Sequence, residues 1–121
     1  MQRADGVVAS AREVVPIGDV ERLDSAAVFT PGELAYAASK SDPERRLAAR
    51  LAAKRAAAAL LGDGIGVSDV EVLPGRGGPP RLRFSPRAEA RLRERGAARA
   101  LVSLTHGRTH AAASVLLLEG E

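Results

Sequence analysis

The stretch from Asp42 to Gly62 constrains the fold of this 121-residue chain more than any other stretch, because it carries a complete set of helix signals. Asp42 can cap the first turn, Pro43 stands where the first N–H would be unpaired anyway, and Gly62 can close the helix. The residues between these ends are mostly Ala, Leu and Arg. The sequence therefore predicts one long central helix, around which the other elements are arranged.

One face of this helix is predicted to combine apolar and cationic side chains. At about 100° per residue, its apolar members are Leu47, Ala48, Leu51, Ala58 and Leu61. Lys54 and Arg55 are expected to project from the same face. Either both side chains reach back to water at the rim of an Ala-rich surface, or they face a core or an interface. A buried Arg55 would need a partner, and Glu13 and Asp63 are the first candidates.

The composition predicts a thin core and an anionic partner. The chain is 45% hydrophobic but only 2% aromatic, so Ala, Val and Leu must form the core, and a small-residue helix surface suits contacts between subunits. The net charge of +3 and the excess of Arg over Lys fit phosphate or carboxylate partners, although an Ala- and Arg-rich genome explains them as well. Without cysteine there is no disulfide and no thiolate metal site.

No apolar run is long enough to span a bilayer, and the amino terminus has no signal-like apolar segment. We therefore expect a cytoplasmic protein without a membrane partner.

The segments before the central helix predict a strand and a short helix. Residues Gly6 to Val15 are apolar and partly β-branched, which indicates a first strand. The segment from Val20 to Ala27 fits either a short helix or a loop. Thr30 to Glu33 reads as a capping box that starts a helix ending near Ser39.

The segments after the central helix are mostly predicted strands. These are Val67–Leu73, Arg81–Phe84 and a hairpin of Ala100–Thr105 with His110–Leu118, while Ser85–Gly96 reads as a charged surface helix. This order predicts one α+β domain over residues 1–121, with helices packed on one face of a largely antiparallel sheet.

Two turns are candidate binding elements. The Gly62–Gly66 turn (GDGIG) could bring backbone N–H groups to a phosphate, or it could simply join helix to strand. His106 and His110 flank the hairpin turn, where no third zinc ligand is nearby, so no metal ligands are assigned. His106 beside Thr105 and Arg108 fits an anion-binding edge, or else a turn facing solvent.

Four segments, in this order, resemble one protein family. They are VFTPGELAYA, ARLAAKRAAAALLGDGIGVSDVEVL, GGPPRLRF and VSLTHGRTHAAASVLL. Together they are similar to the holo-acyl carrier protein synthases, the small trimeric class of 4′-phosphopantetheinyl transferases, from about Val28 to the carboxyl end.

The resemblance implies a fold, an activity and an assembly. Members of this family move phosphopantetheine from coenzyme A to a serine of an acyl carrier protein, release adenosine 3′,5′-bisphosphate and so serve fatty acid biosynthesis. Magnesium is held by an Asp of the first strand and by a Glu that follows the Lys of the central helix. The resemblance further implies a homotrimer with active sites between subunits.

This chain departs from the family at both metal ligands. Arg55 stands where the family has the Glu, and Val8 or Ser10 stands where it has the Asp. A magnesium ion would face net repulsion from such a set. Five family positions around coenzyme A are retained, namely Arg50, Lys54, Gly64, Thr105 and His106.

Three interpretations follow, and they leave open whether the chain is a working enzyme. It could be a non-catalytic homologue that binds coenzyme A or a carrier protein. It could be an impaired transferase in which Arg55, as a catalytic residue, supplies part of the metal's charge at the pyrophosphate. A basic nucleic-acid-binding protein is disfavoured, because aromatic stacking residues are nearly absent.

Overall fold

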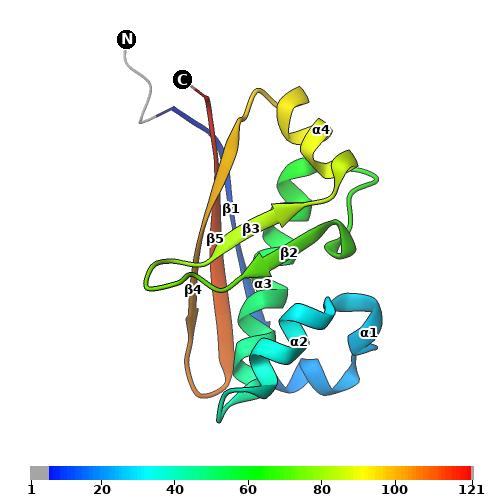
Figure 1. Ribbon diagram of the computed structural model, residues 1–121, viewed down its shortest axis with the longest axis vertical. Helices are drawn as coiled ribbons and strands as arrows, with labels where there is room; N and C mark the ends of the chain where they lie inside the picture. Colours follow the sequence, from blue (N-terminus) through cyan, green and yellow to red (C-terminus); the bar gives the residue numbers. More distant parts are fainter. Residues whose placement is uncertain (1–5, 121) are drawn as a thin grey trace.

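The computed structural model describes residues 6–120. Its elements are β1 (Val7–Pro16), η1 (Ile17–Arg22), α1 (Ser25–Val28), α2 (Pro31–Ala38), α3 (Pro43–Leu61), η2 (Val67–Asp69), β2 (Val70–Leu73), β3 (Arg81–Phe84), α4 (Pro86–Glu94), β4 (Arg99–His106) and β5 (His110–Leu118). Strands β1, β5 and β4 form an antiparallel sheet in that order, and β2 pairs with β3 in a separate antiparallel hairpin. Helix α3 runs along the sheet (Figure 1), so the predicted α+β fold is confirmed.

Small side chains form the contact between α3 and the sheet. On β5, alternate residues Ala111, Ala113, Val115 and Leu117 are buried. Helix α3 contributes a run of buried alanines to the same core. With few large residues to fill the space, the helix must approach the sheet closely, which is the thin core that the composition predicts.

The ends of α3 confirm one predicted cap and correct another. Gly62 closes the helix with a φ of +91°, a conformation that favours glycine. The Asp42 side chain does not cap the amino end, because it accepts a hydrogen bond from Arg46 Nε at 3.0 Å instead. At the carboxyl end, Arg91 Nη1 donates to the carbonyl oxygens of Leu61 (2.8 Å) and Asp63 (2.9 Å). A cation there satisfies free carbonyls and suits the negative end of the helix dipole.

The remaining elements differ from expectation mainly at their boundaries. The segment that was open between helix and loop contains the second half of η1 and most of α1. The capping box of α2 is present, with both hydrogen bonds formed between Thr30 and Glu33. The strand expected over residues 67–73 begins only at Val70, because Val67–Asp69 forms a 3₁₀ turn. A strand over the whole segment would place Asp69 on the side of Glu71, opposite Val70 and Val72, whereas the turn buries Asp69.

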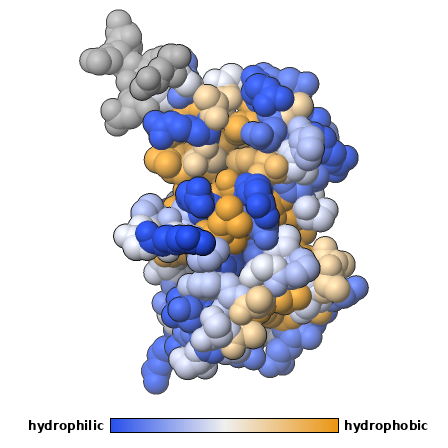
Figure 2. Space-filling model, in the orientation of Figure 1, coloured by the Kyte–Doolittle hydropathy of each residue, from blue (hydrophilic) through white to orange (hydrophobic). Residues whose placement is uncertain are grey.

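On the face of the molecule seen in Figure 2, apolar residues gather near the middle and hydrophilic residues lie around and between them. Two large apolar side chains are exposed on the sheet, Val14 at 60% and Leu101 at 47%. Within residues 6–120, no helix has both the length and the apolar character that crossing a membrane requires.

Candidate ligand site

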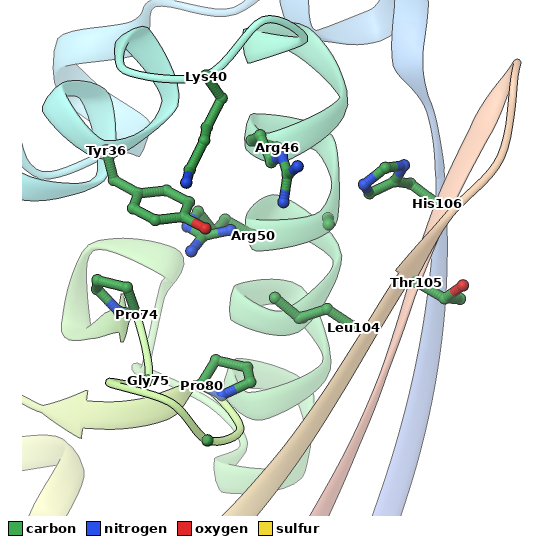
Figure 3. A pocket seen from close by; sticks show the side chains of 12 residues that line it. Tyr36, Lys40, Arg46, Arg50, Pro74, Gly75, Pro80, Leu104, Thr105 and His106 are labelled. Atoms are coloured by element: carbon green, nitrogen blue, oxygen red, sulfur yellow. The ribbon is translucent and has the colours of Figure 1, made fainter.

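A cavity of about 540 Å³ lies between α2, α3, the loop of residues 74–80 and the end of β4. We call it the basic pocket, and define it by Tyr36, Lys40, Arg46, Arg50 and His106. Figure 3 shows the α3 arginines facing the ring of Tyr36, with His106 opposite them on β4. In a pocket of this size, four basic side chains and one aromatic ring favour an anionic ligand.

Arg50 is the most unusual of these residues. It is only 3% exposed, its Nε atom has no hydrogen-bond partner, and it makes no ion pair with a carboxylate of the described chain. Its guanidinium carbon lies 4.1 Å from the centroid of the Tyr36 ring. Burial lowers the pKa of Arg50 from its usual range, because the charged form has lost water. A buried cation of this kind favours an anion that enters from the pocket.

Arg46 is held differently, since it has an acidic partner. Its Nε donates to Asp42 Oδ1 at 3.0 Å, and this hydrogen bond lowers the pKa of the Asp42 carboxyl. Both side chains are partly exposed, so a stronger anion could displace the carboxylate at small cost. Arg46 is therefore available to a ligand in a way that a fully buried ion pair would not be.

The loop of residues 74–80 forms one wall of the pocket, and Gly75 fixes its path. A Cβ atom on Gly75 would lie 2.1 Å from the carbonyl oxygen of Pro79 and 2.2 Å from that of Gly78. Only glycine permits this close backbone approach. Gly75, Gly78 and Pro80 all line the pocket (Figure 3 labels Gly75 and Pro80), so the loop shape determines the pocket shape.

Lys54 does not line the basic pocket. Its side chain is fully buried, and its Nζ donates to Glu33 Oε1 and to the carbonyl oxygen of Val28, both at 2.6 Å. Glu33 also accepts from the backbone N–H groups of Thr30 at 2.9 Å and Val72 at 2.8 Å. This network joins α2, α3 and β2, and it satisfies the lysine without any ligand.

Arg55 was expected on the inward face of the helix, and this expectation was wrong. Arg55 is exposed, whereas the adjacent Lys54 is buried. Successive helical residues point about 100° apart, so only Lys54 falls within the buried sector. Among the described residues, Arg55 forms no ion pair with Glu13 or Asp63, and its exposed charge requires none.

The other proposed site residues lie in different places. His106 lines the basic pocket, while Thr105 borders it with a side chain that points away in Figure 3. Gly64 lies three residues beyond the last residue of α3, and the helix from Arg50 to Leu61 alone spans roughly 16 Å at 1.5 Å per residue. Its carbonyl oxygen accepts a hydrogen bond from Arg87. Within one chain, Arg50 and His106 therefore meet at the basic pocket. Lys54, Arg55 and Gly64 lie elsewhere.

The described residues do not make a good magnesium site. Among residues 6–120 there is no group of three or more His, Cys, Asp or Glu side chains that could hold a metal. On β1, Glu13 is a carboxylate on the same strand face as the buried Val15, whereas Ser10 is exposed. With the cationic Arg55 in place of the helical carboxylate, the donor set does not fit magnesium.

Sequence reasoning missed Tyr36, Lys40 and Arg46. Arg46 and Arg50 are four residues apart on one face of α3, while Tyr36 and Lys40 have the same spacing but Lys40 lies just beyond the end of α2. That spacing was visible in the sequence. Their convergence on one cavity depends on how α2 packs against α3, which no local pattern reveals.

Taken together, the fold and the pocket define a small α+β protein whose basic cavity suits an anionic ligand. The chain is 41% identical over 118 residues to the holo-[acyl-carrier-protein] synthase of Thermus thermophilus, a match that covers 92% of this chain and 93% of that relative. No protein-family model matches the chain.

Solved structures agree in fold. The holo-[acyl-carrier-protein] synthase of Neisseria meningitidis superposes with a TM-score of 0.81 at 22% identity, covering 93% of this chain and 99% of the other. The Helicobacter pylori synthase, solved in complex with coenzyme A, superposes with a TM-score of 0.73 at 18% identity, covering 90% and 99%. This chain belongs to the holo-[acyl-carrier-protein] synthase family.

Proposed function

We propose that this protein transfers the 4′-phosphopantetheine group of coenzyme A to a serine of an acyl carrier protein. In this reaction the serine oxygen bonds to the phosphorus that carries the pantetheine. The bond from that phosphorus to adenosine 3′,5′-bisphosphate breaks, and the serine proton passes to a base or to water. Family membership supports the reaction, and the coenzyme A complex of the Helicobacter pylori relative supports the substrate.

The observation that carries the proposal is the state of Arg50 in the basic pocket. Arg50 is 3% exposed, and its Nε has no partner. Lys40, Arg46 and His106 line the same cavity. Coenzyme A carries a diphosphate and a separate phosphate monoester, and bidentate guanidinium groups suit both. A phosphate in this pocket would supply the negative charge that Arg50 lacks.

We propose that the protein is a homotrimer with shared sites, and the two sides of α3 support an arrangement in which neighbouring copies complete the site. Arg50 and Arg55 are five residues apart, so they point about 140° away from each other. A ligand that contacts both residues would need a second copy of the chain beside the first. Val14 and Leu101, exposed on the sheet, are apolar surface that such a copy could cover. Thr105, which points away from its own pocket, could then serve the neighbouring one.

Arg55 is proposed as the catalytic cation of this composite site. Because the donor set does not fit magnesium, Arg55 would neutralise developing charge on the diphosphate in place of a metal. A single guanidinium carries half the charge of a divalent ion, so the transfer should be slower than in relatives with both carboxylates. Lys54 would act only by holding α2 and α3 together.

A second candidate function is binding of coenzyme A or of a carrier protein without transfer of phosphopantetheine. Arg55 favours this second function, because a cation stands on the exposed helix face where the family has a metal-binding carboxylate. Binding would then persist while catalysis is lost. Nucleic acid is not proposed as a partner, because the pocket has one aromatic ring and no row of rings for stacking bases.

The mass of an apo acyl carrier protein tests these alternatives directly. After incubation with coenzyme A and this protein, transfer adds one phosphopantetheine to the carrier. Parallel reactions contain magnesium or a chelator. We expect slow modification in both, and Arg55→Gln should abolish it. An unmodified carrier together with measurable coenzyme A binding would support the non-catalytic alternative.

A further inference from the structure

Among the described residues that line the basic pocket, Tyr36 is the only Phe, Tyr or Trp, and two cationic side chains lie over its ring. The Arg50 guanidinium carbon is 4.1 Å from its ring centroid, and Lys40 Nζ is 5.1 Å away. We propose that Tyr36 is a positioning residue, whose ring holds the Arg50 guanidinium in the orientation that binds an anionic group of coenzyme A. This inference rests on the proposed function.

Arg50 has little else to hold it. No carboxylate of the described chain pairs with it, and its Nε is buried without a partner. A guanidinium whose Nε has no partner lacks one of the hydrogen bonds that would normally define its orientation, and Tyr36 is the side chain that most favours its charged form. The negative face of an aromatic ring attracts a cation and replaces part of the lost hydration. Stacking on Tyr36 therefore fixes the plane of the group, and it leaves the N–H edges free for a ligand.

The fold fixes Tyr36 in turn. Helix α2 starts at the Thr30 capping box, and Glu33 of that box is tied to Lys54 and to the Val72 backbone. Tyr36 follows Glu33 by three residues, which is close to one helical turn. Ser39 Oγ donates to the Tyr36 carbonyl oxygen at 2.6 Å, at the end of the helix. The buried network therefore sets the ring position, and through the ring it sets Arg50.

A double-mutant cycle of Tyr36→Leu and Arg50→Gln, with coenzyme A binding measured by titration calorimetry, tests the role of Tyr36. Losing the stacking should weaken binding roughly five- to thirtyfold. Tyr36→Phe keeps the ring but removes the hydroxyl that also interacts with Arg50, so its loss of affinity should be clearly smaller than that of Tyr36→Leu. In the Arg50→Gln background, Tyr36→Leu should have no further effect, because there is no guanidinium left to orient. In turnover, the KM for coenzyme A should rise while kcat is unchanged.

Phe29→Leu is the matched control. The Phe29 ring lies 5.5 Å from Lys54 Nζ, but it is buried in the core and does not line the basic pocket. The same aromatic-to-leucine change should lower stability there and leave coenzyme A affinity unchanged. Equal losses of affinity in the two variants would mean that Tyr36 acts through general packing, and would overturn the inference.

A readout without coenzyme A keeps the inference separate from the proposed function. The Arg50 Nε–Hε resonance should carry a ring-current shift that Tyr36→Leu removes and Tyr36→Phe retains, and inorganic pyrophosphate should move it only when the ring is present. If the wild type does not bind coenzyme A, the proposed function fails while this readout still decides the role of Tyr36. A resonance that Tyr36→Leu leaves unmoved overturns the inference, as does wild-type affinity in Tyr36→Leu.

Discussion

Two buried cations on α3, one turn apart, show opposite solutions to the same problem. Lys54 is fully buried and donates to Glu33 and to the Val28 carbonyl oxygen. Arg50 is 3% exposed, stacks on Tyr36 and leaves its Nε unpaired. Since burial costs both charges their hydration, the protein itself compensates one and leaves the other for a ligand. The difference separates a structural cation from a binding cation, which sequence spacing alone could not do.

The largest expected effect on stability comes from removing the buried charge of Lys54. Lys54→Met would leave the Glu33 carboxylate buried without its cation, and should cost about 3–5 kcal/mol of unfolding free energy. Urea denaturation followed by circular dichroism measures it. The double variant Glu33→Gln/Lys54→Met should recover part of the loss, because no buried charge remains. Lys40→Met, at an exposed lysine of the basic pocket, is the control and should change stability by less than about 0.5 kcal/mol. A loss below 1 kcal/mol for Lys54→Met would contradict the structural role.

Removing the Asp69 carboxylate should have the next largest effect on stability, and this effect depends on pH. Its carboxylate accepts from Arg87, from Ser85 Oγ at 2.7 Å and from the Gly66 N–H at 3.0 Å, and the Arg87 hydrogen bonds lower its pKa most. A pKa below the ordinary 3.8 means that this stabilisation is complete above pH 4 or so and is lost as the pH falls further. Asp69→Asn should cost about 1–2 kcal/mol at neutral pH and flatten the acid limb of the stability curve.

Asp19→Asn is the matched control for that experiment. Asp19 also pairs with an arginine, Arg22, at 3.0 Å, but both side chains are exposed. The exposed pair should contribute less than about 0.5 kcal/mol. If Asp19→Asn altered the acid limb as strongly as Asp69→Asn, burial could not be the reason for the Asp69 effect.

Removing the Arg50 charge should have a smaller effect on stability than Lys54→Met or Asp69→Asn. Arg50→Gln loses the stacking on Tyr36 but also removes an unpaired buried cation, so the two contributions oppose each other. We expect the unfolding free energy to stay within about 1 kcal/mol of the wild type. A loss as large as that of Lys54→Met would show that Arg50 is structural too, and the comparison would fail.

The smallest expected change in stability is at Arg55. Arg55→Glu alters an exposed side chain, so the unfolding free energy should move by less than about 0.5 kcal/mol. Combined with Ser10→Asp or Val8→Asp, which restores a carboxylate on β1, the variant should gain magnesium-dependent transfer, measured by carrier-protein mass with and without chelator. Arg55→Gln with the same strand substitution is the neutral control and should show no gain. A wild-type protein already inhibited by chelator would contradict this account of Arg55.

The order of helices and strands could be predicted because local signals agreed with the fold. The Thr30 capping box, the Gly62 stop and the Ser85 cap all lie at observed helix ends. The β4–β5 hairpin also follows its sequence pattern. Asp69 was misplaced because the alternation rule assumes a strand, and a 3₁₀ turn rotates that residue inward.

The site was harder to predict, and the reason is the alanine content of α3. A helix with alanine on every side has no clear polar face, so the pattern could not tell that Lys54 is buried and Arg55 exposed. Arg50 and His106 do line one pocket, as residues assigned to a common ligand should. Tyr36 and Lys40 join them only because α2 folds back onto α3, a tertiary contact without a sequence signature.

The most direct test of the central claim is calorimetric titration of coenzyme A into Arg50→Gln beside the wild type. Losing a charge-assisted bond to phosphate should weaken binding at least tenfold, corresponding to about 1.5–3 kcal/mol. The wild-type affinity should also fall with added salt. Equal coenzyme A affinities for the two proteins would contradict the claim that Arg50 is left unpaired for the ligand.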